Sequence, residues 1–476
     1  MSFDWSLFVD LGFISAALLL ATFIRAKVRF FQRFLIPNAL TAGFILLPLY
    51  NFVLPLAGLT SEGLGALAYH LLSISFVAMS LRKSPRASEK RSGQVFATSV
   101  GVISQYALQA TIGLLLTVAF IRTLYPDLFH SFGFLVPLGF ALGPGQAFAI
   151  GEGWSAAGIF GAGSVGLTFA AVGFLFACFG GVFLINYGVR KHWMKEGLDQ
   201  MLNNTGVRTG VYPRDGKRPV GSHLTTETEA IDSMSFNSGI VLLCYFLTYL
   251  LLRFLGWALA FAGPLGTELA TNLWGISFVF ACIIALGVKE VMKALKVDYV
   301  LDNPTLNRVS GLSVDVMVTS AIAAISLVVV SQYWLPILVT SVIAGAGTAI
   351  TVPWLSSRMF KDHRFHRMLL IFGVSTGTLS TGLALLRVID PDFETPVATD
   401  YTYSASLTFV LVIPFILAIS LPVRAFTTGN MVFFWAALGV AVAYGVFAFI
   451  SYLVLSKGRS FATGKKVWLE HEHPEH

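Results

Sequence analysis

Long apolar segments recur along the chain and are separated by short polar connectors. The clearest of these segments are residues 7–24, 67–81, 95–121, 165–185 and 239–255. A helix that crosses a membrane needs about 20 mostly apolar residues, because the bilayer interior has no water to satisfy exposed backbone groups. The pattern therefore predicts membrane-spanning helices and an all-α polytopic membrane protein.

Two further apolar stretches, residues 134–151 and 369–387, are interrupted by Gly, Pro and hydroxyl residues. Each is too broken to make a good spanning helix. Non-helical backbone is tolerated at membrane depth where protein or a water-filled cavity surrounds it. We therefore predict two re-entrant hairpins that do not cross the membrane, the first entering from outside and the second from inside.

The composition agrees with a membrane protein and gives it an orientation. Hydrophobic residues make up 55% of the 476 residues and charged residues 12%, whereas soluble domains are about one quarter charged. Of the 32 Lys and Arg residues, 28 lie in six connectors, and such connectors face the cytoplasm in membrane proteins. These connectors are residues 25–33, 82–91, 190–218, 289–308, 358–367 and 457–466. Because the basic residues are spread among short connectors, we expect no nucleic-acid partner.

The positions of the connectors divide the chain into two halves. Five predicted spans precede a polar stretch at 190–236 and six follow it. An odd number of spans places the second half in the opposite orientation, which predicts two inverted repeats of about five helices, each with one hairpin. The predicted domains are a first repeat at 1–189, a cytoplasmic linker at 190–236, and a second repeat at 237–422. An extra spanning helix and a cytoplasmic tail follow at 423–476, and the N-terminus is predicted outside a bacterial inner membrane.

The two predicted hairpins are the main candidates for chemistry. Their Gly-rich centres are residues 142–153 and 372–382. Opposed half-helices that meet near mid-membrane would bind a carboxylate at their amide ends, while carbonyls and hydroxyls such as those of Ser380 and Thr381 would ligate Na⁺. The alternative is close helix packing through small residues.

Four charged or ionisable residues are further candidates. Arg387 could clamp a substrate carboxylate, or extend to the inner membrane surface, or pair with Asp390. Asp315 and His70 lie within or near predicted spans, where an ionisable group is a functional candidate, here an ion ligand for Asp315. Glu152 follows the first hairpin and could instead be a helix cap.

Enzymatic functions are poorly supported by the sequence. The chain has no HExxH or Walker motif, and the GxSxG match at 373–377 lacks the strand-to-helix context of a nucleophile elbow. Cys178, Cys244 and Cys282 lie in apolar runs without metal-ligand spacing, so we expect buried free thiols. We therefore predict no enzyme and no cofactor.

Several segments resemble the bacterial glutamate:sodium symporter family. Residues 36–43 are similar to the segment that opens the second span of that family, and 143–147 with 151–155 resemble its first Gly-rich loop. Residues 373–384 resemble its second loop, and the order of elements agrees over about 1–422. The chain departs at Pro144, where the family has His, and near Thr376 and Thr378, where it has glycines.

This resemblance implies an Na⁺-coupled symporter of glutamate or a related small carboxylate. It also implies a homodimer and an elevator-like movement of one domain past another. The substrate-binding residues that it implies are Gly143, Gly145, Gln146, Ser375, Thr376, Gly377 and Thr378. Two alternatives stay open: a transporter of the same shape with another cargo or with H⁺ coupling through Asp315 or Glu152, and a membrane sensor that transports nothing.

Overall fold

The computed structural model describes residues 5–34, 36–83, 92–191, 193, 209–212, 214, 220–261, 263, 266, 270, 273–390, 395–462 and 467–468. These residues form helices and no strands. The first half contains α1 (Ser6–Lys27), α2 (Arg29–Arg33), α3 (Asn38–Pro48), η1 (Leu49–Val53), η2 (Leu54–Ala57), α4 (Glu62–Leu81), α5 (Ser92–Thr123), η4 (His130–Phe134), α6 (Leu135–Pro137), η5 (Leu138–Leu142), α7 (Pro144–Gly153), η6 (Trp154–Ala157), α8 (Ala162–Leu175), η7 (Phe176–Gly180) and α9 (Gly181–Arg190). The second half contains α12 (Ser233–Ala260), α14 (Ser277–Ala294), η8 (Asp298–Val300), α15 (Asn303–Ala323), α16 (Leu327–Gln332), α17 (Trp334–Met359), α18 (Arg364–Thr376), α19 (Leu379–Ile389), α20 (Val397–Ala418), α21 (Leu421–Thr428) and α22 (Val432–Ser456).

Nine helical stretches in the described part of the chain are long and apolar enough to cross a membrane. They confirm the prediction of an all-helical, multi-pass membrane protein. Among the predicted spans, α14 and α15 fall outside this set. Lys289, Glu290 and Lys293 give the end of α14 three charges, and α15 is rich in Ser, Thr and Asn.

The helix after the predicted linker begins four residues before residue 237, where the second repeat was predicted to start. Helix α12 begins at Ser233, because the carboxylate of Asp232 caps it by accepting a hydrogen bond of 2.9 Å from the Ser235 N–H. Residues 192, 194–208, 213 and 215–219 of the predicted linker, like the tail after Trp468, lie outside the described residues. The described stretch 220–232 is attached to α15, where the backbone N–H of His223 donates to Asp302 over 3.1 Å.

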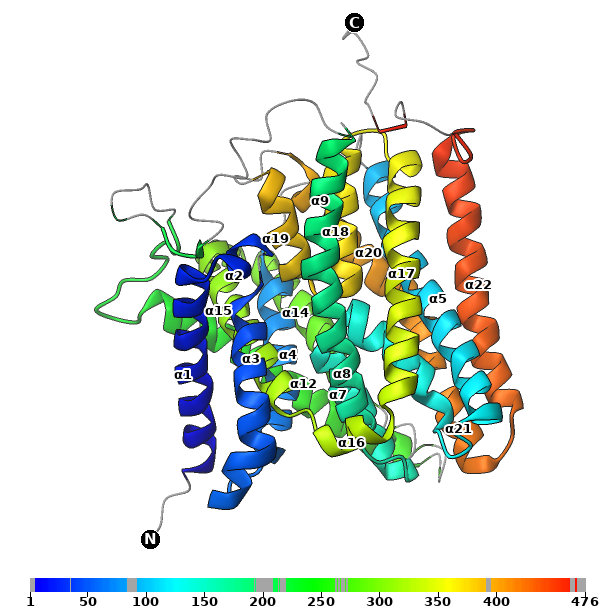
Figure 1. The fold of residues 1–476 in the computed structure, drawn as a ribbon. Coiled ribbons are helices and arrows are strands. Elements are labelled where there is room, and N and C mark those ends of the chain that lie inside the picture. Colours follow the sequence, from blue (N-terminus) through cyan, green and yellow to red (C-terminus); the bar gives the residue numbers. More distant parts are fainter. Residues whose placement is uncertain are drawn as a thin grey trace, which may run out of the picture.

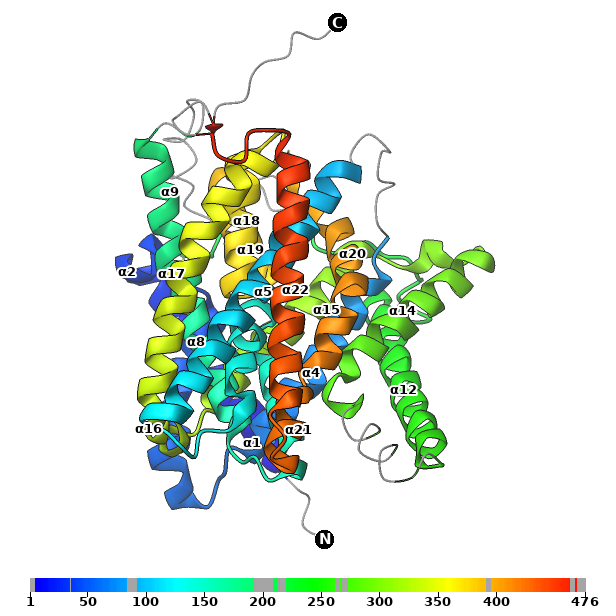
Figure 2. The same cartoon turned by 90° about the vertical axis from the view of Figure 1, so that its right-hand side faces the viewer.

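The helices form two bundles that lie side by side (Figure 1). The side bundle consists of α1, α3, α4, α12, α14 and α15. The hairpin bundle consists of α5, the segment from η4 to α9, and α17 to α22. In Figure 1 the helices α9, α17 and α22 extend past the upper ends of α1 and α3. Figure 2, turned by 90°, shows α12 and α14 projecting from the rest of the molecule.

Helices from the two halves of the chain pack against one another. In the side bundle α4 packs on α15, α3 packs on α15 while α14 packs on α4, and α1 packs on α3 while α12 packs on α14. In the hairpin bundle α5 packs on α17. Four of these contacts join a helix of the first half to a helix of the second half: α4 with α15, α3 with α15, α4 with α14, and α5 with α17.

Four described helix ends that carry basic residues point toward one end of the molecule. The ends of α1, α9, α17 and α22 that carry them all lie toward the top of Figure 1, where the C-terminus also lies. The end of α5, which carries Arg122, lies with α21 at the opposite end, on the side of the N-terminus. The alternation of connectors predicted from the sequence thus agrees with the fold, whichever end faces the cytoplasm.

Apolar side chains on the outermost helices face outward, as expected for a protein surrounded by lipid. Large exposed hydrophobic residues are numerous on α1, α12 and α22, and include Phe8, Phe246 and Val454. Exposed apolar surface of this extent would be unusual in a soluble monomer. The three cysteines are buried and free, as predicted.

Candidate functional site

The first predicted hairpin is a broken helix that turns back at Gly143. The elements η4, α6 and η5 lead up to this residue, and α7 leads away from it. Gly143 has φ +99°, a backbone conformation that residues with a Cβ rarely adopt. Pro144 then occupies the first position of α7, where its missing N–H costs no intrahelical hydrogen bond.

The second hairpin consists of α18 and α19, which pack against each other. Helix α18 ends at Thr376, and α19 starts at Leu379 after Gly377 and Thr378. Gly377 is needed for space, because an added Cβ would lie 2.9 Å from the Thr381 hydroxyl and 3.2 Å from the Gly373 carbonyl oxygen.

The tips of the two hairpins touch. A Cβ placed on Gly143 would lie 3.2 Å from the Thr378 methyl group and 3.9 Å from the carbonyl oxygen of Gly377. A Cβ placed on Gly173 of α8 would lie 2.7 Å from the carbonyl oxygen of Thr376. Most of the residues singled out on the two Gly-rich stretches are therefore gathered in one small region, from opposite ends of the molecule (Figure 1).

Four helix ends converge at this junction. The segment through η5 and helix α18 bring their C-terminal ends to it, and α7 and α19 bring their N-terminal ends. The first intrahelical bonds of the second arms run from Ala147 N to Gly143 O and from Gly382 N to Thr378 O. The N–H groups ahead of these bonds have no intrahelical acceptor, so the N-terminal ends favour an anion and the C-terminal ends a cation.

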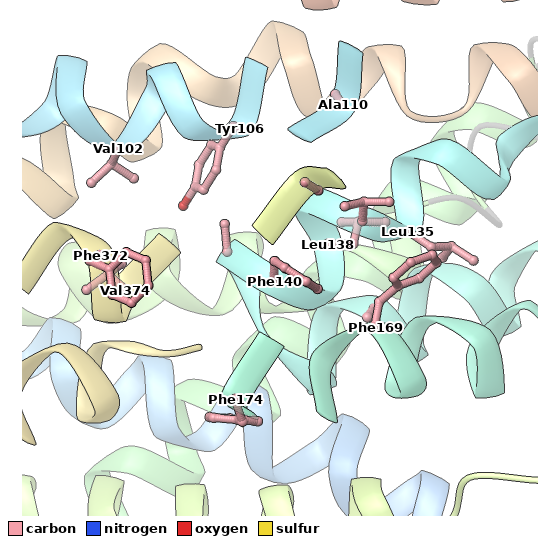
Figure 3. Close-up of a cluster of buried hydrophobic side chains, with 14 of the residues drawn as sticks. Val102, Tyr106, Ala110, Leu135, Leu138, Phe140, Phe169, Phe174, Phe372 and Val374 are labelled. Carbon is pink, nitrogen blue, oxygen red and sulfur yellow. The ribbon is translucent and has the colours of Figure 1, made fainter. Parts of the chain in front are cut away.

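An apolar layer surrounds the tips. Figure 3 shows Phe140 from the first hairpin, Phe174 from α8, and Phe372 and Val374 from α18 within one cluster of buried hydrophobic side chains. All four side chains are at least 97% buried. Within this layer, electrostatic interactions with the helix ends are weakly screened and therefore strong.

A buried amide lies behind the tip of the second hairpin. Gln109 on α5 is fully buried, and its Nε2 donates to the Ser375 carbonyl oxygen over 2.8 Å and to the Thr348 hydroxyl over 3.1 Å. One turn away, Thr351 donates to Gln105 Oε1 over 3.1 Å. These amide residues were not predicted from the sequence, where the candidates within the predicted spans were ionisable groups. Amide side chains one turn apart within an apolar span would have been the signal.

The remaining candidates on the second hairpin are distributed unevenly. Thr381 is buried, with its hydroxyl 3.4 Å from that of Thr378. Ser380 and Thr381 lie in the first turn of α19, the helix end that favours an anion, rather than at an end where carbonyls are free. Arg387 is exposed and lies eight residues beyond Leu379, about 12 Å along the helix from the tip.

Asp315 lies away from the tips, on α15 of the side bundle, where it is exposed. His70 and Glu152 line a different place, a cavity of about 550 Å³ between α4, the far end of α7 and the stretch before α14. There the Nδ1 of His70 lies 2.6 Å from the Tyr245 hydroxyl. The structure therefore does not bring these three ionisable candidates together with the hairpin tips.

The base of the second hairpin contains a buried ion pair that the sequence did not reveal. Arg367 on α18 is 1% exposed and donates to Asp400 of α20 over 2.6 Å and to Asp362 over 2.9 Å. The sequence predicts residues 358–367 as a connector whose basic residues face the cytoplasm. Three of them, Arg358, Arg364 and Arg367, are instead buried, and the first two donate to the backbone of the C-terminal segment.

Comparisons of the chain with models of protein families, with characterised proteins and with solved structures found no match. The resemblance to glutamate:sodium symporters thus stays a prediction.

Proposed function

We propose that this protein is a secondary active transporter that takes up glutamate or a related small carboxylate together with Na⁺. The observation that carries the proposal is the meeting of two hairpin tips, which enter from opposite ends and touch at Gly143 and Thr378. Half-helices that meet in this way provide both polarities of helix end at one place, and transporters use them to hold an anion and its coupling cation.

The polarity of the helix ends determines where the substrate and the cation bind. The substrate carboxylate binds at the free N–H groups of α7 and α19, beside Gly145, Gln146 and Thr378. The coupling cation binds where carbonyl oxygens are free, at the C-terminal end of α18 near Ser375 and Thr376. An anion alone would lose its hydration on entering this buried site, so a cation bound nearby lowers the cost of its entry.

The chain is organised as two inverted repeats in this proposal. The packing of the helices supports it. Helix α4 packs on α15 and α5 packs on α17, and each of these pairs joins helices at equivalent places in the two halves. In this proposal the end that carries the basic connectors faces the cytoplasm, and the N-terminus lies outside a bacterial inner membrane. The working form is a homodimer, as in the family that the sequence resembles.

Substrate crosses the membrane when the hairpin bundle moves past the side bundle. Two asymmetries support an inward-facing state for the structure described here. Helix α7 packs on α4 and α15, whereas no contact as extensive joins α19 to the side bundle within the described residues. The hairpin bundle also reaches farther toward the basic end than α1 and α3 do (Figure 1). The second hairpin is then the one open to the cytoplasm.

Uptake into liposomes tests the proposal. Purified protein is reconstituted, and accumulation of labelled glutamate, aspartate and small mono- and dicarboxylates is followed with an inward Na⁺ gradient or an equal K⁺ gradient. We expect accumulation that requires Na⁺. Equal uptake in both salts would contradict Na⁺ coupling, and no uptake of any of these acids would contradict the substrate class.

Coupling to H⁺ is the second candidate, and it has a specific observation in its favour. Glu152 and His70 line one cavity between the two bundles, where groups able to carry protons would change surroundings when the bundles move. A pH gradient without Na⁺ that drives uptake, lost in Glu152→Gln, would favour this function over Na⁺ symport.

A further inference from the structure

We infer that the buried groups of Gln109, Thr348 and Ser375, here called the Gln109 cluster, form a binding site for a monovalent cation. The inference deepens the proposed function and rests on it for the role of the cation as a coupling ion. The three residues come from α5, α17 and α18, and all are fully buried.

The orientation of the Gln109 amide is fixed by its donors. Its Nε2 donates to the Ser375 carbonyl oxygen and to the Thr348 hydroxyl, at 2.8 and 3.1 Å. If the amide were reversed, its oxygen would face the carbonyl oxygen of Ser375, and two acceptors would repel each other. Nε2 is therefore the amide atom that faces Ser375 and Thr348, and Oε1 does not face the Ser375 carbonyl oxygen.

The oxygens left over have no donor. Gln109 Oε1 and the Ser375 hydroxyl are both buried atoms without a hydrogen-bond partner. Buried polar atoms are nearly always paired, so two unpaired atoms on residues that are joined by a hydrogen bond require an explanation. A cation ligated by both oxygens would satisfy them together.

The chemistry of the cluster selects the kind of cation. Its ligands are an amide oxygen and two hydroxyl oxygens, all neutral, and they stand beside the C-terminal end of α18, whose free carbonyls carry partial negative charge. Divalent cations require carboxylates in most protein sites. No group of three His, Cys, Asp or Glu side chains suited to a metal ion occurs within the described residues. Neutral oxygens at a helix C-terminus therefore favour Na⁺ or a similar monovalent ion.

The position of the cluster links the cation to the second hairpin. Ser375 is the penultimate residue of α18, two residues before Gly377 at the tip. A cation held by Gln109 and Ser375 would tie α18 to α5 and fix the tip against which the first hairpin rests.

Cation-dependent thermal stability of the purified full chain, with no substrate present, tests the site. Melting temperatures are measured against rising NaCl, with choline chloride keeping the ionic strength constant. Ser375→Ala and Thr348→Val each remove one oxygen, and Thr351→Val is the control, because it removes a half-buried hydroxyl one turn along the same helix. We expect Na⁺ to stabilise the wild type. The half-saturating Na⁺ concentration should rise at least tenfold in the two cluster variants and stay within twofold in the control.

The outcomes separate this inference from the proposed function. If Na⁺, Li⁺ and K⁺ all fail to stabilise the wild type, the site is refuted. If Na⁺ stabilises the cluster variants as well as the wild type, the site is again refuted, although Na⁺ symport survives with its cation elsewhere. If the variants lose Na⁺ binding while wild-type uptake is independent of Na⁺, the site stands and Na⁺ symport is the claim that fails.

Discussion

A disulfide between the two bundles should stop transport by holding the protein in the conformation described here. Gly275, ahead of α14, and Ile150 of α7 face each other across the boundary. A Cβ on Gly275 would lie 3.7 Å from Ile150 Cα and 4.0 Å from Ile150 Cγ1. The separation of the two Cβ atoms is therefore about 4–5 Å, and disulfides join Cβ atoms at about 3.5–4.5 Å. Gly275→Cys combined with Ile150→Cys should cross-link with little adjustment.

The size of the effect follows from the geometry of the bond. A disulfide does not form across Cα atoms more than about 7 Å apart. A slip of α7 past the side bundle by only one helical turn, about 5.4 Å, would exceed this limit. We expect uptake by the oxidised double variant to fall at least tenfold, close to that of protein-free liposomes, and to return after reduction with dithiothreitol.

The control is a disulfide within one bundle. A Cβ on Gly445 of α22 would lie 4.0 Å from the Cβ of Ala107 on α5, and both helices belong to the hairpin bundle. Oxidised Ala107→Cys with Gly445→Cys should transport normally, because its bond moves with the bundle. Wild-type uptake by fully cross-linked Gly275/Ile150 protein would refute movement between the bundles. Loss of uptake in the control as well would mean that disulfides inhibit for some other reason.

Two further predictions concern stability, measured by thermal unfolding in detergent. Asp400→Ala should lower the free energy of unfolding by about 3–5 kcal/mol, because it removes a partner from the buried Arg367 guanidinium. Asp362→Ala, at a side chain that is 39% exposed, should lower it by less than about 1 kcal/mol. Equal losses in the two variants would contradict this assignment. Burial alone would raise the pKa of Asp302, but hydrogen bonds from Thr305 and the linker lower it below its ordinary 3.8. Because a lowered pKa contributes stability that is lost as the pH falls through it, Asp302→Asn should flatten the fall in stability between about pH 5 and 3.

The membrane fold could be predicted largely from the sequence. Long apolar runs have one stable solution in lipid, since only a helix satisfies every backbone group within its own segment. The positions of the basic connectors then predicted which ends of successive helices lie on the same side of the membrane. The same count of positive charges gave the wrong location for Arg367 in the connector 358–367. Such a count cannot distinguish an exposed Lys from a buried Arg whose partner, Asp400, lies 33 residues away.

The candidate site was predictable in its backbone and much less in its side chains. Gly143 and Gly377 could be found from the sequence because they interrupt apolar stretches, and a break in a membrane helix leaves backbone groups without hydrogen bonds. Gln109 did not stand out, since its partners on α17 and α18 lie 239 and 266 residues away in sequence. Arg387 and Asp315 attracted attention through their charge, although charge alone does not indicate distance from the tips.

The groups gathered at the tips constrain the charge of the cargo. They are backbone amides, hydroxyls and the amide side chains of Gln146 and Gln109, and Arg387 begins about 12 Å along α19 from them. Pro144 also removes one N–H from the start of α7, so α19 contributes more of the donors. A site built from dipoles alone does not neutralise a buried anion. The charge of a carboxylate must then be balanced by the cations that accompany it, which ties the charge of the cargo to the number of cations transported in each cycle.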